Sequence, residues 1–278
     1  MLNWLADKPY LKLVYRCETG ENLNLEKPKT FNEKLQWLKL YDRNSKYNIY
    51  ADKYDVRAHI EETIGEQYLI PFIGLYDSVD EIDWDALPNQ FVLKCTHGSS
   101  SNIICSDKNT LNIEDAKKKL RKWMEKSWYW FGREWVYKDI KPRIVCEKYM
   151  VDESGTELKD YKIFCFNGKA KLIQVDFNRY KDHKRNLYTT DWQYIDAKIK
   201  RPNDASKIIQ RPEKLEDMLM LAEKLSANIP HARVDFYSIN NSIYFGEITF
   251  FHGSGFEKFE PDSLGDQMGN WIRLPNIK

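Results

Sequence analysis

The chain has 278 residues, of which 42% are hydrophobic and 31% charged, so it can bury a sizeable core and is not disordered. Its 43 lysines and arginines against 42 aspartates and glutamates give a formal charge of +1, which excludes a global attraction to nucleic acid or to an anionic membrane. No uncharged stretch approaches the roughly 18 apolar residues of a membrane span, and the early Asp7 and Lys8 are unlike a signal peptide. We expect a soluble, cytoplasmic protein with no membrane span, which holds any anionic ligand locally.

Cysteine and histidine are scattered along the chain. There are 5 cysteines, no C-x-x-C pair occurs, and several lie in apolar strand-like runs, which favours buried, reduced thiols. Zinc sites need Cys and His clustered at short spacings, and the 5 histidines occur singly. The sequence therefore predicts no transition-metal site.

Helices are predicted over the first part of the chain. Thr30 and Glu33 have the spacing of a capping box, and an apolar stripe at helical spacing follows from Phe31 to Leu40. A second helix is predicted over 52–64, where Gly65 ends it.

From Tyr68 the pattern changes to short apolar runs bounded by turn residues, which is typical of strands. Strands are predicted over 68–76, 91–95, 102–105 and 143–150, with a basic, Trp-containing helix over 114–129.

Two hairpins are predicted in the second half of the chain. Asn167-Gly168 suits the type I′ turn that joins twisted strands, here over 160–166 and 169–177. Asn240-Asn241 joins strands over 232–239 and 242–250, and a helix over 214–225 precedes them. This order predicts an α+β fold with antiparallel hairpins, unlike a regular βαβ alternation.

The second of these hairpins carries a candidate metal site. It brings Asp235 and Glu247 toward each other on adjacent strands, and two neighbouring carboxylates suit a hard cation. Strand alternation places Arg233 on the same face as Asp235. The alternative is a cross-strand ion pair on a solvated face, in which Arg233 simply neutralises the carboxylates.

A candidate phosphate-binding loop runs from Lys94 to Asn102. The lysine ends an apolar strand and leads into Gly and Ser residues, whose backbone N–H groups could receive phosphate oxygens. It is not a P-loop, because the lysine precedes the glycine. The alternative is an ordinary hairpin turn with a surface lysine.

Further charged residues lie on and beside the strands between these two sites. Alternation places Asp160 and Lys162 on one strand face, where they could address a ribose and phosphates or form a surface salt bridge. The basic loop over 178–186 could clamp a phosphate or an acidic substrate, or be a solvated loop.

In order, these elements resemble the ATP-grasp superfamily of ATP-dependent carboxylate–amine ligases over about residues 51–259. The matching elements are Asp52-Lys53, the loop at Lys94, the strand ending at Met150, Arg233-x-Asp235 and Glu247-x-Thr249 before Gly253-Ser-Gly255. Together with Gly132-Arg-Glu-Trp135 and the strand over 160–168, they are similar to a narrower branch, the TupA-like ATP-grasp proteins of teichuronopeptide and surface-polysaccharide biosynthesis.

The resemblance implies an α+β ATP-grasp fold, in which two lobes of mixed or antiparallel sheet with helices enclose ATP. The implied domains are a helical N-terminal segment over 1–50, a small lobe over 51–150 and a large lobe over 151–278.

The resemblance also implies the roles of individual residues. ATP would be bound by Lys53, Lys94, His97, Gly98, Ser99, Ser100, Ser101, Glu147, Lys148, Tyr149, Met150, Asp160 and Lys162. Mg²⁺ would be held by Asp235, Glu247 and Thr249, and Arg233 would steady the acyl phosphate. From the basic loop over 178–186, Arg179 and Arg185 are candidate catalytic residues that could clamp a phosphate or an acidic substrate. The family usually has Asn where this chain has Thr249, so the number of metal ions, one or two, stays open.

The implied function is an ATP-dependent ligase that forms an amide through an acyl phosphate, releasing ADP. The implied partners are a uronic-acid-containing glycan or its precursor and an amino acid or other amine, with no nucleic acid. One alternative is a glycosyltransferase of the same kind of pathway, with Asp83-Trp84-Asp85 as a metal-binding D-x-D. Another is a non-catalytic nucleotide- or glycan-binding module.

Overall fold

The computed structural model describes residues 2–153, 155, 158–178 and 182–276. The chain divides into two compact units, and each is described by itself below. Unit 1 comprises Met1–Asn44 and Asp152–Lys278, and unit 2 comprises Ser45–Val151.

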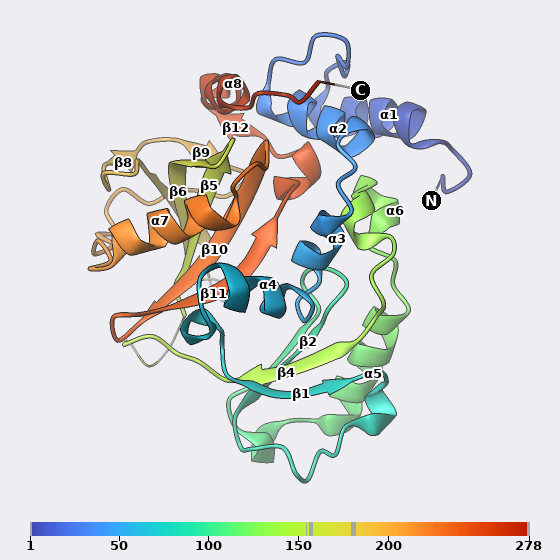
Figure 1. Ribbon diagram of the computed structural model, residues 1–278, viewed down its shortest axis with the longest axis vertical. Coiled ribbons are helices and arrows are strands. Elements are labelled where there is room, and N and C mark those ends of the chain that lie inside the picture. Colours follow the sequence, from blue (N-terminus) through green and yellow to red (C-terminus); the bar gives the residue numbers. More distant parts are fainter. Residues whose placement is uncertain (1, 154, 156–157, 179–181, 277–278) are drawn as a thin grey trace. The chain divides into compact units, whose positions relative to one another are not determined.

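Unit 2 contains a four-stranded antiparallel sheet with the strand order β1-β4-β2-β3 (Figure 1). Its elements are α3 (Lys46–Ala51), α4 (Val56–Thr63), β1 (Phe72–Tyr76), β2 (Phe91–Cys95), β3 (Asn102–Cys105), α5 (Ile113–Met124), α6 (Tyr129–Gly132) and β4 (Ile144–Lys148). Short 3₁₀ turns cover η1 (Glu66–Tyr68), η2 (Val79–Glu81), η3 (Lys108–Thr110) and η4 (Trp135–Tyr137).

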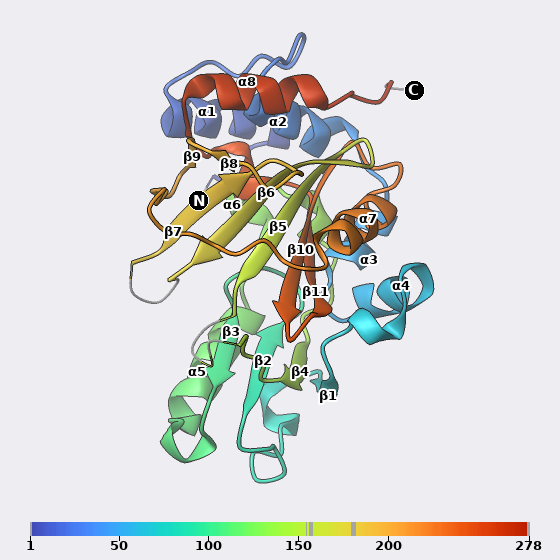
Figure 2. The same cartoon turned by 90° about the vertical axis from the view of Figure 1, so that its left-hand side faces the viewer.

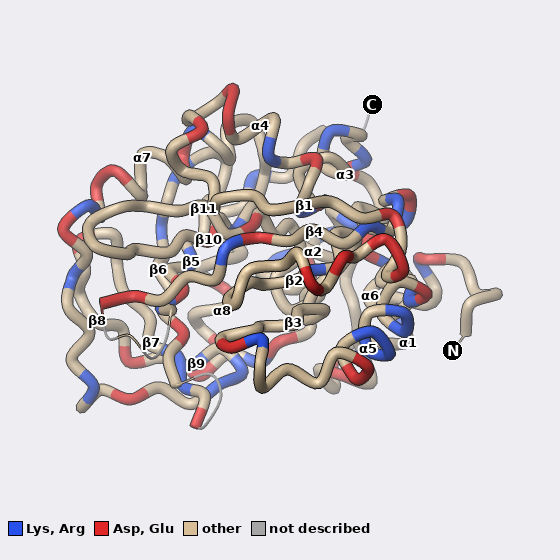
Figure 3. Tube along the Cα trace, turned by 90° about the horizontal axis from the view of Figure 1, so that it is seen from below, with Lys and Arg blue, Asp and Glu red and all other residues tan. Residues whose placement is uncertain are grey.

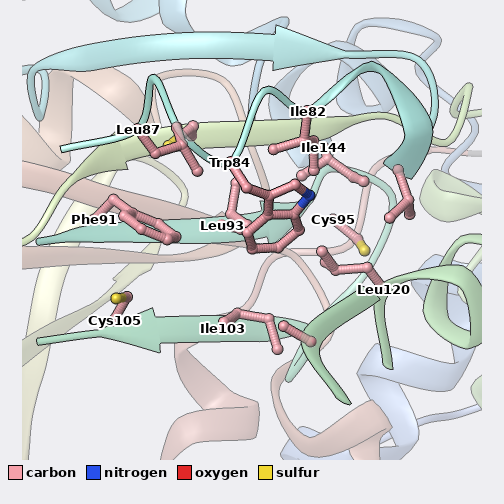
Figure 4. Packing of buried hydrophobic residues seen from close by; sticks show 13 residues of the cluster. Ile82, Trp84, Leu87, Phe91, Leu93, Cys95, Ile103, Cys105, Leu120 and Ile144 are labelled. Atoms are coloured by element: carbon pink, nitrogen blue, oxygen red, sulfur yellow. The ribbon is translucent and has the colours of Figure 1, made fainter. Parts of the chain in front are cut away.

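The core of unit 2 lies on one face of this sheet. Phe91, Leu93 and Cys95 alternate along β2 and pack with Trp84 and with Leu120 of α5 (Figure 4). Lysines and arginines recur along α5 (Figure 3), and the helix buries Ala116 and Leu120. Alternation along β2 therefore leaves Val92 and Lys94 to the opposite face of the sheet.

Unit 1 contains a six-stranded antiparallel sheet with the order β11-β10-β5-β6-β7-β8, and a two-stranded ribbon of β12 and β9 (Figure 2). Its helices are α1 (Asp7–Thr19), α2 (Phe31–Tyr41), α7 (Leu215–Leu225) and α8 (Asp262–Trp271), with a 3₁₀ turn, η5 (His252–Gly255). Its strands are β5 (Asp160–Phe166), β6 (Lys169–Phe177), β7 (Lys184–Tyr188), β8 (Tyr194–Ile195), β9 (Lys198–Ile199), β10 (His231–Ile239), β11 (Ser242–Thr249) and β12 (Phe259–Glu260).

Helices cover parts of the large sheet. α7 packs against β5, β6 and β10, which bury its apolar side chains (Figure 1). α2 lies beside α8 and contacts η5 (Figure 2). The N-terminal helices therefore belong to the same compact unit as the C-terminal half of the chain.

The sequence predicted the hairpins correctly. Asn167 and Gly168 have φ values of 49° and 76°, as a type I′ turn requires, and Asn240 and Asn241 have 46° and 59°. The capping box of α2 is confirmed, because Thr30 and Glu33 each bind the other's backbone N–H.

Three predicted boundaries were wrong. The helix predicted over 52–64 begins at Val56, because the Asp52 carboxylate accepts the N–H groups of Tyr54 and Asp55 in a turn. The strand predicted from Tyr68 begins at Phe72, after a 3₁₀ turn and Pro71, and the helix predicted to 129 ends at Met124. The helix α8 and the strands β7, β8, β9 and β12 were not predicted.

The thiols agree with the prediction in most cases. All five cysteines are free, and Cys95, Cys105, Cys146 and Cys165 are buried, whereas Cys17 is exposed. Burial raises the pKa of Cys146 and of Cys165 to about 12, so both stay protonated at neutral pH.

Candidate functional site

Lys94 belongs to a half-buried cluster of charges on the sheet of unit 2. Its Nζ lies 2.7 Å from Oε2 of Glu147, and Nη1 of Arg57 lies 3.3 Å from Oε1 of the same carboxylate. The strand register brings Glu147 and Lys94 together, because Glu147 of β4 pairs with Val92, two residues before Lys94 on the adjacent strand β2. Two cations share one carboxylate, so the cluster retains a positive charge that suits an anionic ligand.

Arg57 was missed by the sequence analysis. It lies on α4, and its guanidinium also stands 5.3 Å from the centre of the Phe72 ring. Nothing in the local pattern distinguishes it from other helical arginines, since its partner Glu147 is 90 residues away.

The predicted phosphate loop is held by the segment after α5. An added Cβ at Gly98 would lie 2.1 Å from the Trp128 ring, so only glycine fits against this indole. Nζ of Lys53 donates a hydrogen bond to the Gly98 carbonyl. Nε2 of His97 lies 3.2 Å from the carbonyl oxygen of Trp123, and burial lowers the pKa of His97, so a neutral ring donates this bond.

The remaining residues of this predicted nucleotide site differ in exposure. Ser99 and Ser100 are exposed, whereas Ser101 is buried and its hydroxyl donates to the Ser99 carbonyl at 3.2 Å. Lys148 ends β4 and is exposed, and the following Tyr149 and Met150 are half-buried.

Unit 1 gathers the other predicted residues on one face of its sheet. Asp235 of β10 pairs with Glu247 of β11 on one side and with Lys162 of β5 on the other, and Arg233 pairs with Thr249. We call Asp160, Lys162, Arg233, Asp235, Glu247 and Thr249 the charged face. The sharing of one face by Arg233 and Asp235, predicted from alternation, is confirmed.

Arg233 links the members of the charged face. Its Nε and Nη2 each lie 2.7 Å from an oxygen of Asp235, and Nη2 also lies 3.0 Å from Oε1 of Glu247 and from Oγ1 of Thr249. Nζ of Lys162 stands 2.8 Å from Asp160 and 2.5 Å from Asp235. The predicted metal ligands are thus in mutual contact through a guanidinium.

Burial and charge oppose each other in this cluster. Burial alone lowers the pKa of Lys162, but Asp160 and Asp235 outweigh it, so the pKa is raised and the ammonium stays charged. The pKa of Arg233 is raised in the same way by Asp235 and Glu247. Burial raises the pKa of Asp235 against the opposing pull of Arg233 and Lys162.

The donor set suits Mg²⁺. The three carboxylates of the charged face meet two cations, which leaves one negative charge, and carboxylate and hydroxyl oxygens are the hard donors that this ion prefers. Among the described residues there is no group of three or more His, Cys, Asp or Glu arranged to hold a metal ion. Asp235, Glu247 and Thr249 have oxygen donors of the type that suits Mg²⁺, and further ligands would have to come from a bound molecule.

Of the predicted arginines, Arg179 lies outside the described residues. Arg185 is buried, with Nε 2.8 Å from Oδ1 of Asp176 and Nη1 2.9 Å from the Ile199 carbonyl. Oε2 of Glu257 lies 3.4 Å from the same Nη1. Arg185 is thus anchored by protein groups on several sides.

The structure also adds residues that the sequence analysis missed. Nδ1 of His252 lies 2.7 Å from Nη1 of Arg233, and Nε2 of His252 lies 3.0 Å from Oε2 of Glu257. A weak signal was present, since His252 directly precedes Gly253-Ser-Gly255.

The Asp83-Trp84-Asp85 triplet, the D-x-D of the glycosyltransferase alternative, forms a turn. Oδ1 of Asp83 accepts the backbone N–H groups of Asp85 and Ala86, and Trp84 is buried in the core of unit 2. Asp83 is thus a turn-capping carboxylate.

Comparison with known proteins decides the family. The model of the TupA-like ATP-grasp family matches residues 33–273, which is most of the chain. The chain belongs to the TupA-like ATP-grasp family. The α+β architecture is therefore an ATP-grasp fold, and both the charged face and the Lys94 cluster lie inside the matched region. A search of the curated proteins finds no match.

Several solved structures similar to this ATP-grasp chain are described as ligases. D-alanine–D-alanine ligase from Bacillus anthracis is 19% identical, with 73% of this chain and 57% of that chain covered and a TM-score of 0.38. The Helicobacter pylori enzyme is 15% identical, with 90% and 69% covered and a TM-score of 0.44. L-amino acid ligase from Bacillus licheniformis is 13% identical, with 81% and 49% covered and a TM-score of 0.46. The chain thus spans little more than half of the first of these ligases.

Within the described residues, none of the helices has the length and apolar character needed to cross a lipid bilayer.

Proposed function

We propose that this TupA-like ATP-grasp protein is an ATP-dependent, ADP-forming carboxylate–amine ligase. The observation that carries the proposal is the charged face, which buries carboxylates and cations at positions where the family resemblance implies metal ligands and an arginine. Buried ion clusters contribute little net stability, so their presence on one sheet face is better explained by binding and chemistry.

In the proposed reaction, an oxygen of the substrate carboxylate attacks the γ-phosphorus of ATP. The bond between that phosphorus and the bridging oxygen breaks, which gives an acyl phosphate and ADP. The nitrogen of an amine then attacks the acyl carbon, phosphate leaves with the C–O bonding electrons, and the nitrogen loses a proton to leave an amide.

The proposed nucleotide-binding residues are supported by the charge of unit 2. Lys53 and Lys94 would bind phosphate oxygens, and the backbone of the loop over 98–101 would add N–H donors. His97 would keep the loop in place through its contact with Trp123. Glu147, Lys148, Tyr149 and Met150 would contact the adenine.

The charged face would bind the phosphoryl group in transfer. Asp160 and Lys162 would lie near the ribose and phosphates, with Lys162 held between two carboxylates. Mg²⁺ at Asp235, Glu247 and Thr249 would neutralise the charge of the transferring phosphoryl group. Arg233 would donate to the acyl phosphate, and Arg179 and Arg185 would favour an acidic substrate.

The family resemblance suggests the substrates. We propose that the acid is a uronic acid of a surface glycan or its precursor, and that an amino acid or another amine attacks it. Because the reaction consumes ATP, we place it in the cytoplasm. We also retain the division into an N-terminal segment over 1–50, a small lobe over 51–150 and a large lobe over 151–278 as a proposal.

The test is a nucleotide-release assay with the full chain, MgATP, and panels of uronic acids and amines. We expect ADP only when both substrates are present, and hydroxylamine in place of the amine should yield a hydroxamate from the acyl phosphate. AMP would indicate adenylation, UDP from a UDP-sugar would indicate a glycosyltransferase, and phosphorylation of an alcohol without an amine would indicate a kinase.

A matched pair of variants ties the activity to the charged face. Glu247→Gln should slow ADP release at least about a hundredfold, because phosphoryl charge is less well neutralised. Glu260→Gln removes an exposed carboxylate whose ion-pair partner among the described residues is Lys198, at 2.6 Å, and should retain the wild-type rate. Equal rates for the two variants would exclude this role of Glu247.

A further inference from the structure

All three nitrogens of the Arg233 guanidinium have acceptors. The Asp235 carboxylate accepts hydrogen bonds from Nε and Nη2, and Oε1 of Glu247 and Oγ1 of Thr249 also accept from Nη2. The remaining nitrogen, Nη1, lies 2.7 Å from Nδ1 of His252. A guanidinium has N–H donors and no acceptor, so Nδ1 must be the unprotonated nitrogen of the imidazole.

The other side of the His252 ring faces a carboxylate. Nε2 lies 3.0 Å from Oε2 of Glu257 without the alignment of a hydrogen bond, and because Nδ1 must be unprotonated, the single proton of a neutral ring belongs on Nε2, facing this carboxylate. Glu257 is paired in turn with Arg185 at 3.4 Å and with Lys200 at 3.2 Å, which keeps it ionised. Burial lowers the pKa of His252 to about 4 in spite of Glu257, so the ring is neutral at pH 7 and has the single proton that this arrangement needs.

A neutral acceptor at this position has an electrostatic consequence. Asp235 and Glu247 already draw on the positive charge of Arg233. A third carboxylate on Nη1 would cancel more of that charge, whereas an imidazole nitrogen satisfies the buried donor and leaves the charge in place. The arrangement therefore orients the guanidinium at a small electrostatic cost.

The turn that carries His252 is held by helix α2. Nε2 of Gln36 donates to the carbonyls of Ser254 and Gly255 at 3.0 and 2.8 Å, and Nζ of the buried Lys39 donates to the Ser254 carbonyl at 2.8 Å. Gly253, Ser254 and Gly255 all have positive φ values, and an added Cβ at Gly255 would lie 2.6 Å from Nε2 of Gln36. A separate bond, from Nδ2 of Asn32 to the Glu257 carbonyl at 2.9 Å, holds the following residues.

We propose that His252 is a positioning residue for Arg233, that Glu257 sets its ring tautomer, and that α2 anchors both through the η5 turn. The inference rests on the proposed function only in giving Arg233 a catalytic task. A guanidinium fixed at every nitrogen can meet developing phosphoryl charge without reorganising. Helix α2 thereby supports the chemistry of a strand far along the chain.

The first experiment is independent of activity. Long-range ¹H–¹⁵N spectra of the full chain labelled on histidine should show His252 at neutral pH with a pyridine-type Nδ1 and a protonated Nε2. Disappearance of the signals in His252→Phe or in His252→Asn assigns them, so one folded variant suffices. A protonated Nδ1, or a doubly protonated ring at pH 7, would overturn the proposal.

The second experiment compares variants at the same position. Asn retains an acceptor near the place of Nδ1, whereas Phe fills the ring volume without one. We expect His252→Phe to lower kcat by about tenfold to a hundredfold with KM for ATP within about twofold. His252→Asn should recover most of that loss, and the control His59→Phe, at a half-buried histidine of unit 2, should keep the wild-type kcat.

The Arg233 Nε–Hε resonance, assigned with Arg233→Lys, gives a further readout. It should shift and broaden in His252→Phe and return toward the wild-type position in His252→Asn. An unchanged resonance and kcat in His252→Phe, or equal losses in both variants, would refute the positioning role. If the wild type forms no ADP with any substrate pair, the proposed function fails, and the tautomer and the Arg233 resonance still decide the inference.

Discussion

Asp235 and Glu247, although both proposed as metal ligands, should respond differently to removal of their charge. Asparagine and glutamine preserve side-chain size, so size alone predicts that Asp235→Asn and Glu247→Gln fold equally well. The surroundings predict otherwise. The Asp235 side chain is 2% exposed and receives three charged hydrogen bonds, at 2.5, 2.7 and 2.7 Å, whereas that of Glu247 is 37% exposed and is paired with Arg233 at 3.0 Å and hydrogen-bonded by Thr249 at 3.3 Å.

The expected loss of stability in Asp235→Asn follows from these three charged hydrogen bonds. In Asp235→Asn the amide keeps one acceptor and turns an N–H₂ group toward a cation, so at least one charged hydrogen bond of about 1.5–3 kcal/mol is lost. A neutral amide costs less free energy to bury than a carboxylate, and this difference offsets part of the loss. We expect a net cost of about 2–4 kcal/mol, which lowers Tm by roughly 3–7 °C in a chain of this size. Glu247→Gln should cost about 0–1 kcal/mol.

Thermal and urea unfolding of the two variants and the wild type, at one pH and without nucleotide, measure the difference. Far-ultraviolet circular dichroism at low temperature checks that each variant is folded before heating. Equal Tm values for Asp235→Asn and Glu247→Gln would show that breaking the buried bonds of Asp235 carries no extra cost, and would refute this account of how the two carboxylates differ.

Three further predictions concern other parts of the chain. Lys94→Met should weaken ATP binding about tenfold or more by calorimetry, while stability falls by about 1 kcal/mol, because Glu147 keeps a second cation; unchanged affinity would exclude the phosphate role. Gly98→Ala should cost about 1–3 kcal/mol and shift the Trp128 fluorescence, since the added methyl overlaps the indole; wild-type stability and emission would contradict this contact. Burial lowers the pKa of His231 to about 3, so the unfolded chain takes up a proton first as pH falls below 6.5. The free energy of unfolding of the wild type should therefore fall by about 2–3 kcal/mol between pH 6.5 and 4.5 through His231. In His231→Phe the free energy of unfolding, measured by urea denaturation, should depend less on pH over that range. The same pH dependence in both proteins would show that the buried ring titrates as it does in the unfolded chain.

Local patterns were enough to predict several features of this protein. The hairpins around Asn167-Gly168 and Asn240-Asn241 depend on turn residues and alternation within about 20 residues of chain, which are written directly in the sequence. The same alternation predicted that Arg233 and Asp235 share a face. Motif order then led to the family, because the residue types to which the resemblance assigns phosphate and metal binding recur at the ends of recognisable strands.

Other features depend on contacts between segments that no local pattern connects. Lys162 meets Asp235 across 73 residues, and Gln36 reaches the η5 turn across 218. Strand pairing and helix docking decide such meetings, since they bury surfaces whose partners are fixed only when the sheet has formed. The sequence therefore determined which charged residues line β5, β10 and β11, and only the tertiary structure decided that His252 and Glu257, held by α2, complete the surroundings of Arg233.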